Sequence, residues 1–262
     1  MDVTQIFQAI ILGIVEGLTE FLPVSSTGHL IFIGKIIGFE STGKVFEIAI
    51  QLGAIFAIIV KYRSKFISVA TSLNNPKSQS FVLNLALAFF PAMFVGVLAH
   101  SYIKTHLFSV TVVAISLIMG GIAIIIIENM VRKVKVKSID DIKPFTAFKI
   151  GVFQCLAMVP GVSRSGATIM GSLLMGLDRK AAAEFSFFLA VPTMLAATCY
   201  DIYKNYAQLD ISDINIIIIG FITAFITALL VIDIALKFIT RHGFKPFAYY
   251  RIILGTSLLI LY

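Results

Sequence analysis

The chain has 262 residues, of which 58% are hydrophobic and only 13% are charged, and its mean hydropathy is +0.97. Soluble domains carry roughly a quarter charged residues, so this composition excludes an ordinary soluble protein and indicates an integral membrane protein. The formal net charge of +7 is therefore no sign of a nucleic-acid partner, and we expect none. In a membrane protein, the places where positive charges fall along the chain indicate its orientation instead.

The first 39 residues contain two short apolar runs, 5–15 and 28–39, joined by a polar link at 23–26. Each run is shorter than the roughly 20 residues that a helix needs to cross the hydrocarbon. Irregular backbone at membrane depth is tolerated only where protein or a water-filled cavity satisfies it. We therefore expect these two runs to form a re-entrant helical hairpin.

Longer apolar segments follow, and the pattern of short and long segments then starts again. Residues 147–159 and 166–177 are short runs on either side of a second polar stretch, which predicts a second re-entrant hairpin. The long segments are 45–61, 82–101, 109–128, 181–200, 214–236 and 247–262. The expected fold is an all-α polytopic membrane protein with six transmembrane helices and two re-entrant hairpins, forming one integral membrane domain over 1–262.

The second half of the chain reads as a repeat of the first. A shift of 138 residues pairs Gly13 with Gly151 and Ser25 with Ser163, and several such matches in the same order favour a duplication over chance. The boundaries we expect are repeat one at 1–128, a cytoplasmic linker at 129–146 and repeat two at 147–262. Each half carries three spans, an odd number, so the repeats should have inverted topology with a site near the midplane.

The positive charges favour one orientation of this arrangement. Fifteen Lys and Arg residues fall in the connections assigned to one side, and four fall on the other. Because positive residues concentrate in cytoplasmic loops, both termini are expected outside, with the first hairpin entering from outside and the second from the cytoplasm. Arg251, inside the last span, is expected to extend its side chain to the cytoplasmic interface.

Two carboxylates interrupt the first apolar run. Glu16 and Glu20 are four residues apart and share one face of a helix. An ionised carboxylate in hydrocarbon costs about 2.5 kcal/mol or more, so the pair needs a divalent metal, an arginine or protonation. The alternative is a pair at a helix end that touches headgroup water.

Hydroxyl groups follow these carboxylates at the start of the next helix. Pro23 ends the first helix, and Ser25 or Ser26 can cap the second, which places hydroxyls and free N–H groups where an anion is favoured. A serine beside a carboxylate or His29 is a candidate nucleophile. The alternatives are a plain helix cap and a structural histidine.

The second polar stretch carries the cation. Ser163, Arg164, Ser165 and Thr168 all offer donors suited to phosphate, and arginine binds phosphate through two parallel hydrogen bonds. The alternative is that Arg164 only neutralises one of the glutamates. Because one half keeps the carboxylates and the other keeps the arginine, a phosphoryl-transfer site would need both halves.

The two motifs, Glu16-x-x-x-Glu20 leading into Pro-Val-Ser-Ser-x-x-His29, and Pro160-Gly-x-Ser-Arg-Ser-x-x-Thr168, resemble those of the undecaprenyl-diphosphatase family. These are the bacitracin-resistance phosphatases of bacterial membranes, and the resemblance covers essentially the whole chain. It implies removal of the terminal phosphate of undecaprenyl diphosphate, which recycles the lipid carrier of peptidoglycan synthesis.

The resemblance also implies roles for individual residues. The catalytic residues would be Ser26, Glu20, Glu16, His29 and Arg164. The substrate-binding residues would be Ser25, Thr27, Gly28, Ser163, Ser165, Gly166 and Thr168. Glu16 and Glu20 would bind a divalent cation, Mg²⁺ or Ca²⁺.

Two alternatives concern the mechanism and the function. Ser26 would attack the terminal phosphorus, or metal-bound water would attack it directly with Ser26 as a ligand only. Inverted repeats with broken helices are also typical of transporters, so a transporter or flippase of the prenyl phosphate carrier is the second hypothesis. The partners expected are the polyprenyl diphosphate substrate, the lipids of the bacterial inner membrane and, in a homodimer, a second copy.

Overall fold

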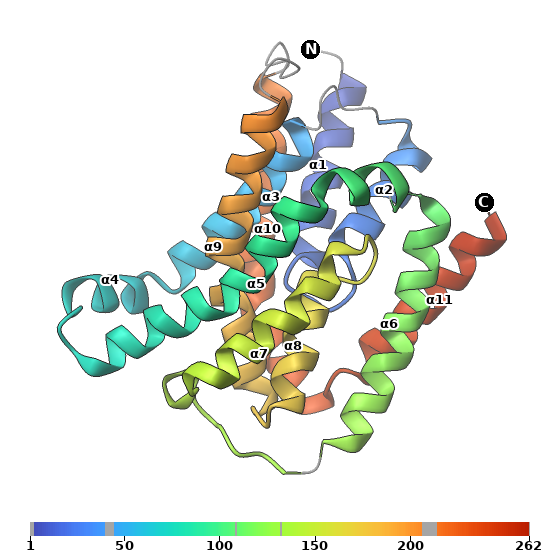
Figure 1. Ribbon diagram of the computed structural model, residues 1–262. Coiled ribbons are helices and arrows are strands. Elements are labelled where there is room, and N and C mark those ends of the chain that lie inside the picture. The colour runs from blue at the N-terminus through green and yellow to red at the C-terminus, as the bar shows by residue number, and fades with distance from the viewer. Residues whose placement is uncertain (1–2, 40–44, 108, 132, 206–213, 262) are drawn as a thin grey trace.

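The computed structural model describes residues 3–39, 45–107, 109–131, 133–205 and 214–261, and this part of the chain is almost entirely helical (Figure 1). The helices are α1 (Val3–Thr19), α2 (Ser26–Ile37), α3 (Val45–Lys61), α4 (Arg63–Thr71), α5 (Pro76–His106), α6 (Val110–Met130), α7 (Pro144–Gln154), α8 (Arg164–Leu174), α9 (Arg179–Asn205), α10 (Ile214–His242) and α11 (Lys245–Leu261). Two 3-10 turns, η2 (Ile139–Asp141) and η3 (Cys155–Met158), precede and follow α7. The prediction of an all-α fold is confirmed.

The multi-pass character of the chain is also confirmed. Four described helices, α5, α6, α9 and α10, are long and apolar enough to cross a membrane. The bent pair α3 and α4, with an angle of 68° between them, makes a fifth if it is one span. The 17 described residues of α11 stand at the lower limit of roughly 17–25 residues for a span, so the count of six stays a prediction.

Helix α4 was not expected, because its residues fall in a charged connection that hydropathy assigns to a loop. The helix forms where Phe66 packs edge-on against Phe188 of α9, with ring centroids 5.5 Å apart. Val69 on the same helix is buried. Contact with the rest of the protein therefore decides the structure of this segment.

The central helix of the bundle is α9. In its most apolar stretch 61% of residues are buried inside the protein, against 22% in α5 and in α10. Phe185, Phe187 and Phe188 are almost completely buried, and Tyr62 and Phe81 pack edge-on against Phe188. The outer helices direct their apolar faces away from this core, as helices in contact with lipid do.

The first helix of each hairpin packs against a long helix of the other half of the chain. A Cβ atom on Gly13 of α1 would lie 2.7 Å from the carbonyl oxygen of Gly220 in α10. A Cβ atom on Gly151 of α7 would lie 2.3 Å from that of Ala88 in α5. The two glycines paired by the 138-residue shift thus have the same role. Each lets the first helix of a hairpin lie close to a long helix of the other half, as expected of a duplicated chain.

The start of α1 and the end of α11 lie at the same end of the molecule, and the connection from α6 to α7 lies at the opposite end (Figure 1). This arrangement fits termini on one side and the basic linker on the other. The orientation in a membrane and the repeat boundaries stay predictions. Of the charges counted above, Lys44 and Arg132 lie outside the described residues.

Substitution of Gly151 by alanine tests the close packing of α7 on α5. The added methyl group cannot fit beside the backbone of Ala88, so we expect a loss of about 1–3 kcal/mol of stability, seen as a lower midpoint of thermal unfolding in detergent. Gly34→Ala is the matched control, because a Cβ atom there would approach nothing closer than 3.9 Å. Equal midpoints for the two variants would contradict this account.

Candidate active site

Ser25 and Ser163 begin the second helix of each hairpin with the same strained backbone. They have φ angles of 69° and 76° and are the two residues other than glycine with positive φ in the described chain. Each side-chain hydroxyl accepts a hydrogen bond from the backbone three residues on, from Gly28 N at 3.3 Å and from Gly166 N at 3.1 Å. Such strain costs about 1–3 kcal/mol per residue and concentrates at functional sites.

The two hairpin tips are in direct contact. The hydroxyl of Ser165 donates to the carbonyl oxygen of Leu22 at 2.7 Å, and the guanidinium of Arg164 donates to Glu20 Oε1 at 2.8 Å. The expected meeting of the two polar stretches is therefore present in the structure.

Arg251 of α11 is hydrogen-bonded to both hairpin tips. Its guanidinium donates to the carbonyl oxygens of Pro23 at 3.0 Å, Val162 at 2.9 Å and Gly161 at 3.0 Å. Further bonds reach the carbonyl oxygens of Ser116 and Leu117 in α6. The expectation that Arg251 extends to the cytoplasmic interface is wrong, since its side chain is buried and satisfies carbonyl groups that the broken helices leave unpaired.

Ser26 and Glu20 form the candidate catalytic pair. Ser26 Oγ donates to Glu20 Oε2 at 2.5 Å, and both residues are buried. The other oxygen of the same carboxylate receives the Arg164 guanidinium. A hydroxyl held by a carboxylate in this way is prepared to lose its proton as it attacks.

The orientation of Arg164 is fixed by α9. Its Nη1 donates to the carbonyl oxygen of Ser186 at 2.9 Å. The hydroxyl of Ser186 in turn lies 2.6 Å from that of Thr168. Thr168 thus supports the arginine through Ser186 and does not line the cavity described below.

Glu16 lies one helical turn before Glu20 and is buried, and neither of its carboxylate oxygens has a hydrogen-bond partner. An unpaired carboxylate in such a place needs a cation or a proton. No group of three His, Cys, Asp or Glu residues in the described chain is close enough to share a metal. Mg²⁺, however, commonly binds through one or two carboxylates together with substrate phosphates, so Glu16 and Glu20 fit a cation that the substrate helps to hold.

His29 lies on α2, one turn after Ser26, and both its ring nitrogens are engaged elsewhere. Nδ1 donates to the carbonyl oxygen of Ser25 at 2.8 Å, because a carbonyl can only accept. Nε2 lies 2.6 Å from the hydroxyl of Tyr250, and the two rings stack. In this arrangement Glu20, rather than His29, holds the Ser26 hydroxyl.

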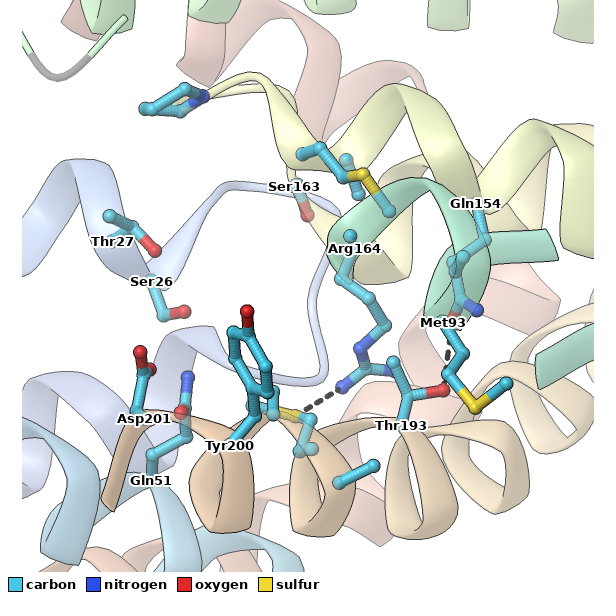
Figure 2. Close-up of a pocket in the computed structure, with 18 of the residues that line it drawn as sticks. Ser26, Thr27, Gln51, Met93, Gln154, Ser163, Arg164, Thr193, Tyr200 and Asp201 are labelled. Atoms are coloured by element: carbon cyan, nitrogen blue, oxygen red, sulfur yellow. Dashed lines mark hydrogen bonds between the residues drawn. The ribbon is translucent and has the colours of Figure 1, made fainter. Parts of the chain in front are cut away.

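A cavity of about 340 Å³ adjoins Ser26 and Glu20. Six of the expected site residues line it: Glu20, Ser25, Ser26, Thr27, Ser163 and Arg164. Six do not: Glu16, Gly28, His29, Ser165, Gly166 and Thr168. Figure 2 shows Ser26 and Thr27 near Gln51 and Asp201, with Arg164 reaching into the cavity from another side.

Helix α9 adds residues to this cavity that no motif indicated, namely Thr193, Tyr200 and Asp201. Thr193 lies in the middle of the long apolar segment and Tyr200 and Asp201 lie at its end, where hydropathy alone predicts a helix facing lipid. The sequence offered one signal, which is an aspartate near the end of a span, since intramembrane acidic residues tend to face a cavity or a partner.

Replacing Arg251 tests its role in holding the two tips together. Arg251→Met would leave buried carbonyl groups without donors, each at about 1–3 kcal/mol, so a large fall in the thermal unfolding midpoint is expected. Arg251→Lys keeps the charge but offers fewer donors and should lie between this variant and the wild type. Ile253→Ala on the exposed face of α11 is the control, and a midpoint for Arg251→Met equal to that of the control would refute this role.

Comparison with known proteins places the chain in a family. The family model described as Bacitracin resistance protein BacA matches residues 9–257. The undecaprenyl-diphosphatase of Methylobacillus flagellatus is 52% identical, with 100% of both chains covered. Undecaprenyl-diphosphatase 2 of Paramagnetospirillum magneticum is 51% identical over 97% of this chain and 98% of its own. The undecaprenyl-diphosphatase of Neisseria meningitidis serogroup C is 48% identical over 100% and 97%. The chain therefore belongs to the bacitracin resistance protein BacA family.

Proposed function

We propose that this chain hydrolyses undecaprenyl diphosphate to undecaprenyl phosphate and inorganic phosphate, and so recycles the lipid carrier and gives bacitracin resistance. One observation supports this above the others. The Ser26 hydroxyl is hydrogen-bonded to Glu20, and Glu20 is paired with Arg164 of the opposite hairpin, at the wall of a cavity. The names of the relatives agree with this activity.

The ends of two helices favour an anion in this cavity. Helices α2 and α8 both begin at its wall, at Ser26 and Arg164. The free N–H groups and the positive end of the helix dipole at each N-terminus attract phosphate oxygens. Arg164 adds a full positive charge and can bind two oxygens at once.

The chemical step follows from the contact between Ser26 and Glu20. The incoming phosphate competes with Glu20 for Arg164, which frees the carboxylate to accept the Ser26 proton. Ser26 Oγ forms a bond to the terminal phosphorus as the bridging P–O bond breaks, and undecaprenyl phosphate leaves with the proton that Glu20 took from Ser26. The ionised Glu20 then takes a proton from water, the water oxygen bonds to the phosphorus of the phosphoserine, and the bond to Ser26 Oγ breaks. The proton on Glu20 returns to Ser26 Oγ, and inorganic phosphate is released.

Direct attack by water is the alternative, with Ser26 only orienting the phosphate. A phosphoserine trapped at Ser26 with the prenyl diphosphate would support the covalent route. Absence of a trapped species, together with unchanged turnover of Ser26→Ala, would favour the direct one.

Phosphate release from undecaprenyl diphosphate in vesicles tests the function itself. Ser26→Ala, Glu20→Gln and Arg164→Ala should each lower kcat by roughly a hundredfold or more, the usual cost of removing a group that acts in the transition state. Ser109→Ala is the matched control, because Ser109 also caps a helix but lies outside the cavity. Full activity of the three variants would overturn the site, and lipid movement across the vesicle without phosphate release would favour a transporter.

A divalent cation, Mg²⁺ or Ca²⁺, is proposed as the cofactor, held by Glu16 and Glu20 together with the substrate. When bound, it would neutralise charge on the phosphate oxygens. The protein residues orient this charge, since Glu20 is fixed by Ser26 and Arg164 while Glu16 keeps both oxygens unoccupied.

Thermal unfolding with and without Mg²⁺ or Ca²⁺ tests the cofactor without relying on turnover. With inorganic pyrophosphate present in place of the substrate, the cation should raise the unfolding midpoint of the wild type. In Glu16→Gln this increase should be lost, while the midpoint in chelator should not fall, because an amide needs no counter-charge. Glu184→Gln serves as the control, since Glu184 pairs with Lys180 elsewhere on α9. An equal increase in both variants would exclude Glu16 as a ligand.

The bacterial inner membrane, with both termini outside, is the proposed location. The excess of positive charge in the connections of one side supports this orientation. A homodimer also stays a prediction.

A further inference from the structure

His29 and Tyr250 form a hydrogen-bonded pair beside the start of α2. Nδ1 of His29 lies 2.8 Å from the carbonyl oxygen of Ser25, and Nε2 lies 2.6 Å from the hydroxyl of Tyr250. The two rings are stacked, with centroids 5.5 Å apart and an angle of 8° between their planes. Neither residue lines the cavity, so the pair can act on the reaction only through the residue that it holds, which is Ser25.

The two partners define which ring nitrogen carries hydrogen. A carbonyl oxygen only accepts hydrogen bonds, so Nδ1 of His29 is the donor to Ser25. In a neutral ring Nε2 is then an acceptor, and the Tyr250 hydroxyl donates to it. The Arg251 guanidinium acts on this ring electrostatically and disfavours a second positive charge beside it. The Tyr250 hydroxyl therefore favours the neutral tautomer that can hold the Ser25 carbonyl.

The second hairpin has no equivalent of this contact. The Ser25 carbonyl oxygen accepts from the backbone N–H of His29 at 3.3 Å and also from its ring. In the second hairpin the Ser163 carbonyl oxygen accepts from the backbone N–H of Ala167 at 3.0 Å. Ala167 is the counterpart of His29 at the 138-residue shift, and its side chain has no donor. The hydrogen bond from a side chain is thus specific to the half that carries Ser26.

The nucleophile and the arginine differ in what fixes their positions. The long side chain of Arg164 is held at its far end by bonds to Ser186 and Glu20. The side chain of Ser26 is short, so the position of its Oγ follows the backbone, which at the preceding residue, Ser25, has a positive φ of 69°. A strained backbone of this kind persists only where the surrounding structure holds it. The hydrogen bond from the His29 ring to Ser25 supplies such a hold.

We propose that Tyr250 is a positioning residue for the reaction, because its hydroxyl keeps His29 in the tautomer that donates to Ser25 and so holds Ser26 in line with the phosphorus. The inference rests on the proposed function, in which Ser26 attacks the terminal phosphate. A misplacement of about 1 Å can cost roughly a hundredfold in rate, so a hydroxyl outside the cavity can affect turnover. The effect should fall on kcat, because Arg164 and the start of α8 still bind the phosphate.

Phosphate release in vesicles compares Tyr250→Phe with Tyr249→Phe. The first variant removes the hydroxyl and keeps the stacked ring. Tyr249 is the matched control, because it is the adjacent residue, is more exposed than Tyr250 and is absent from the cavity wall. Tyr250→Phe should lower kcat by about tenfold, near the upper end for one net hydrogen bond, and leave KM almost unchanged, whereas Tyr249→Phe should keep both values. Equal kcat values for the two variants would overturn the proposal.

Two variants of His29 separate positioning from proton transfer. In His29→Asn the amide can still donate to the Ser25 carbonyl but cannot take up a proton, and His29→Leu can do neither. His29→Asn should keep a kcat about ten times that of His29→Leu, the difference of one hydrogen bond. Tyr250→Phe should have no further effect in the His29→Asn chain, because the two residues act as one unit. Equal losses in the Asn and Leu variants, or an undiminished effect of Tyr250→Phe beside His29→Asn, would refute the route through Ser25.

A spectroscopic measurement on the wild type depends neither on turnover nor on the folding of a variant. The nitrogen-15 chemical shifts of the His29 ring distinguish the nitrogen that carries hydrogen from the one that does not. Hydrogen on Nδ1 alone is expected in the wild type, and a mixture of both tautomers in Tyr250→Phe. Hydrogen on Nε2 in the wild type, or an unchanged spectrum in Tyr250→Phe, would contradict the proposal. Failure of the wild type to release phosphate would reject the proposed function alone, and the spectra would still decide whether Tyr250 sets the tautomer.

Discussion

The Arg251 guanidinium is the contact on which the arrangement of the two hairpins depends. Each hairpin stops within the protein and leaves carbonyl groups with no helical partner, and in a membrane no water is available to pair with them. Arg251 donates to both tips at once, to Pro23 on one side and to Gly161 and Val162 on the other. The relative position of Ser26 and Arg164 follows from that shared anchor.

Direct pairing balances only part of the charge in the centre of the site. Glu20 is paired with Arg164, and Arg251 donates to backbone carbonyl oxygens only, whereas neither oxygen of Glu16 has a partner. Burying isolated charges is costly, whereas paired and hydrogen-bonded ones are tolerated. A diphosphate adds further negative charge, and Glu16 is where a compensating cation or proton would be held.

The sequence predicted the features that arise from local pattern. The length of apolar runs indicated the short helices of both hairpins, and residue types indicated that Arg164 would meet one of the two glutamates, Glu16 or Glu20. Hydropathy could not predict α4, because its burial comes from contact with α9. It also assigned Arg251 to the interface, since the carbonyl groups that bind Arg251 come from three separate segments and no local pattern contains them.

The matched strain at Ser25 and Ser163 shows what the two hairpins share and where they differ. Glycine would adopt a positive φ without strain, but it has no hydroxyl to cap the helix, and both caps are made by that hydroxyl. Each half therefore keeps a strained serine that orients a helix N-terminus toward the cavity, which supplies anion binding twice. The position that follows the cap differs, with Ser26 in one half and Arg164 in the other. The same backbone geometry thus presents a nucleophile from one side and a positive charge from the other, and a phosphate bound between the two helix ends would contact both.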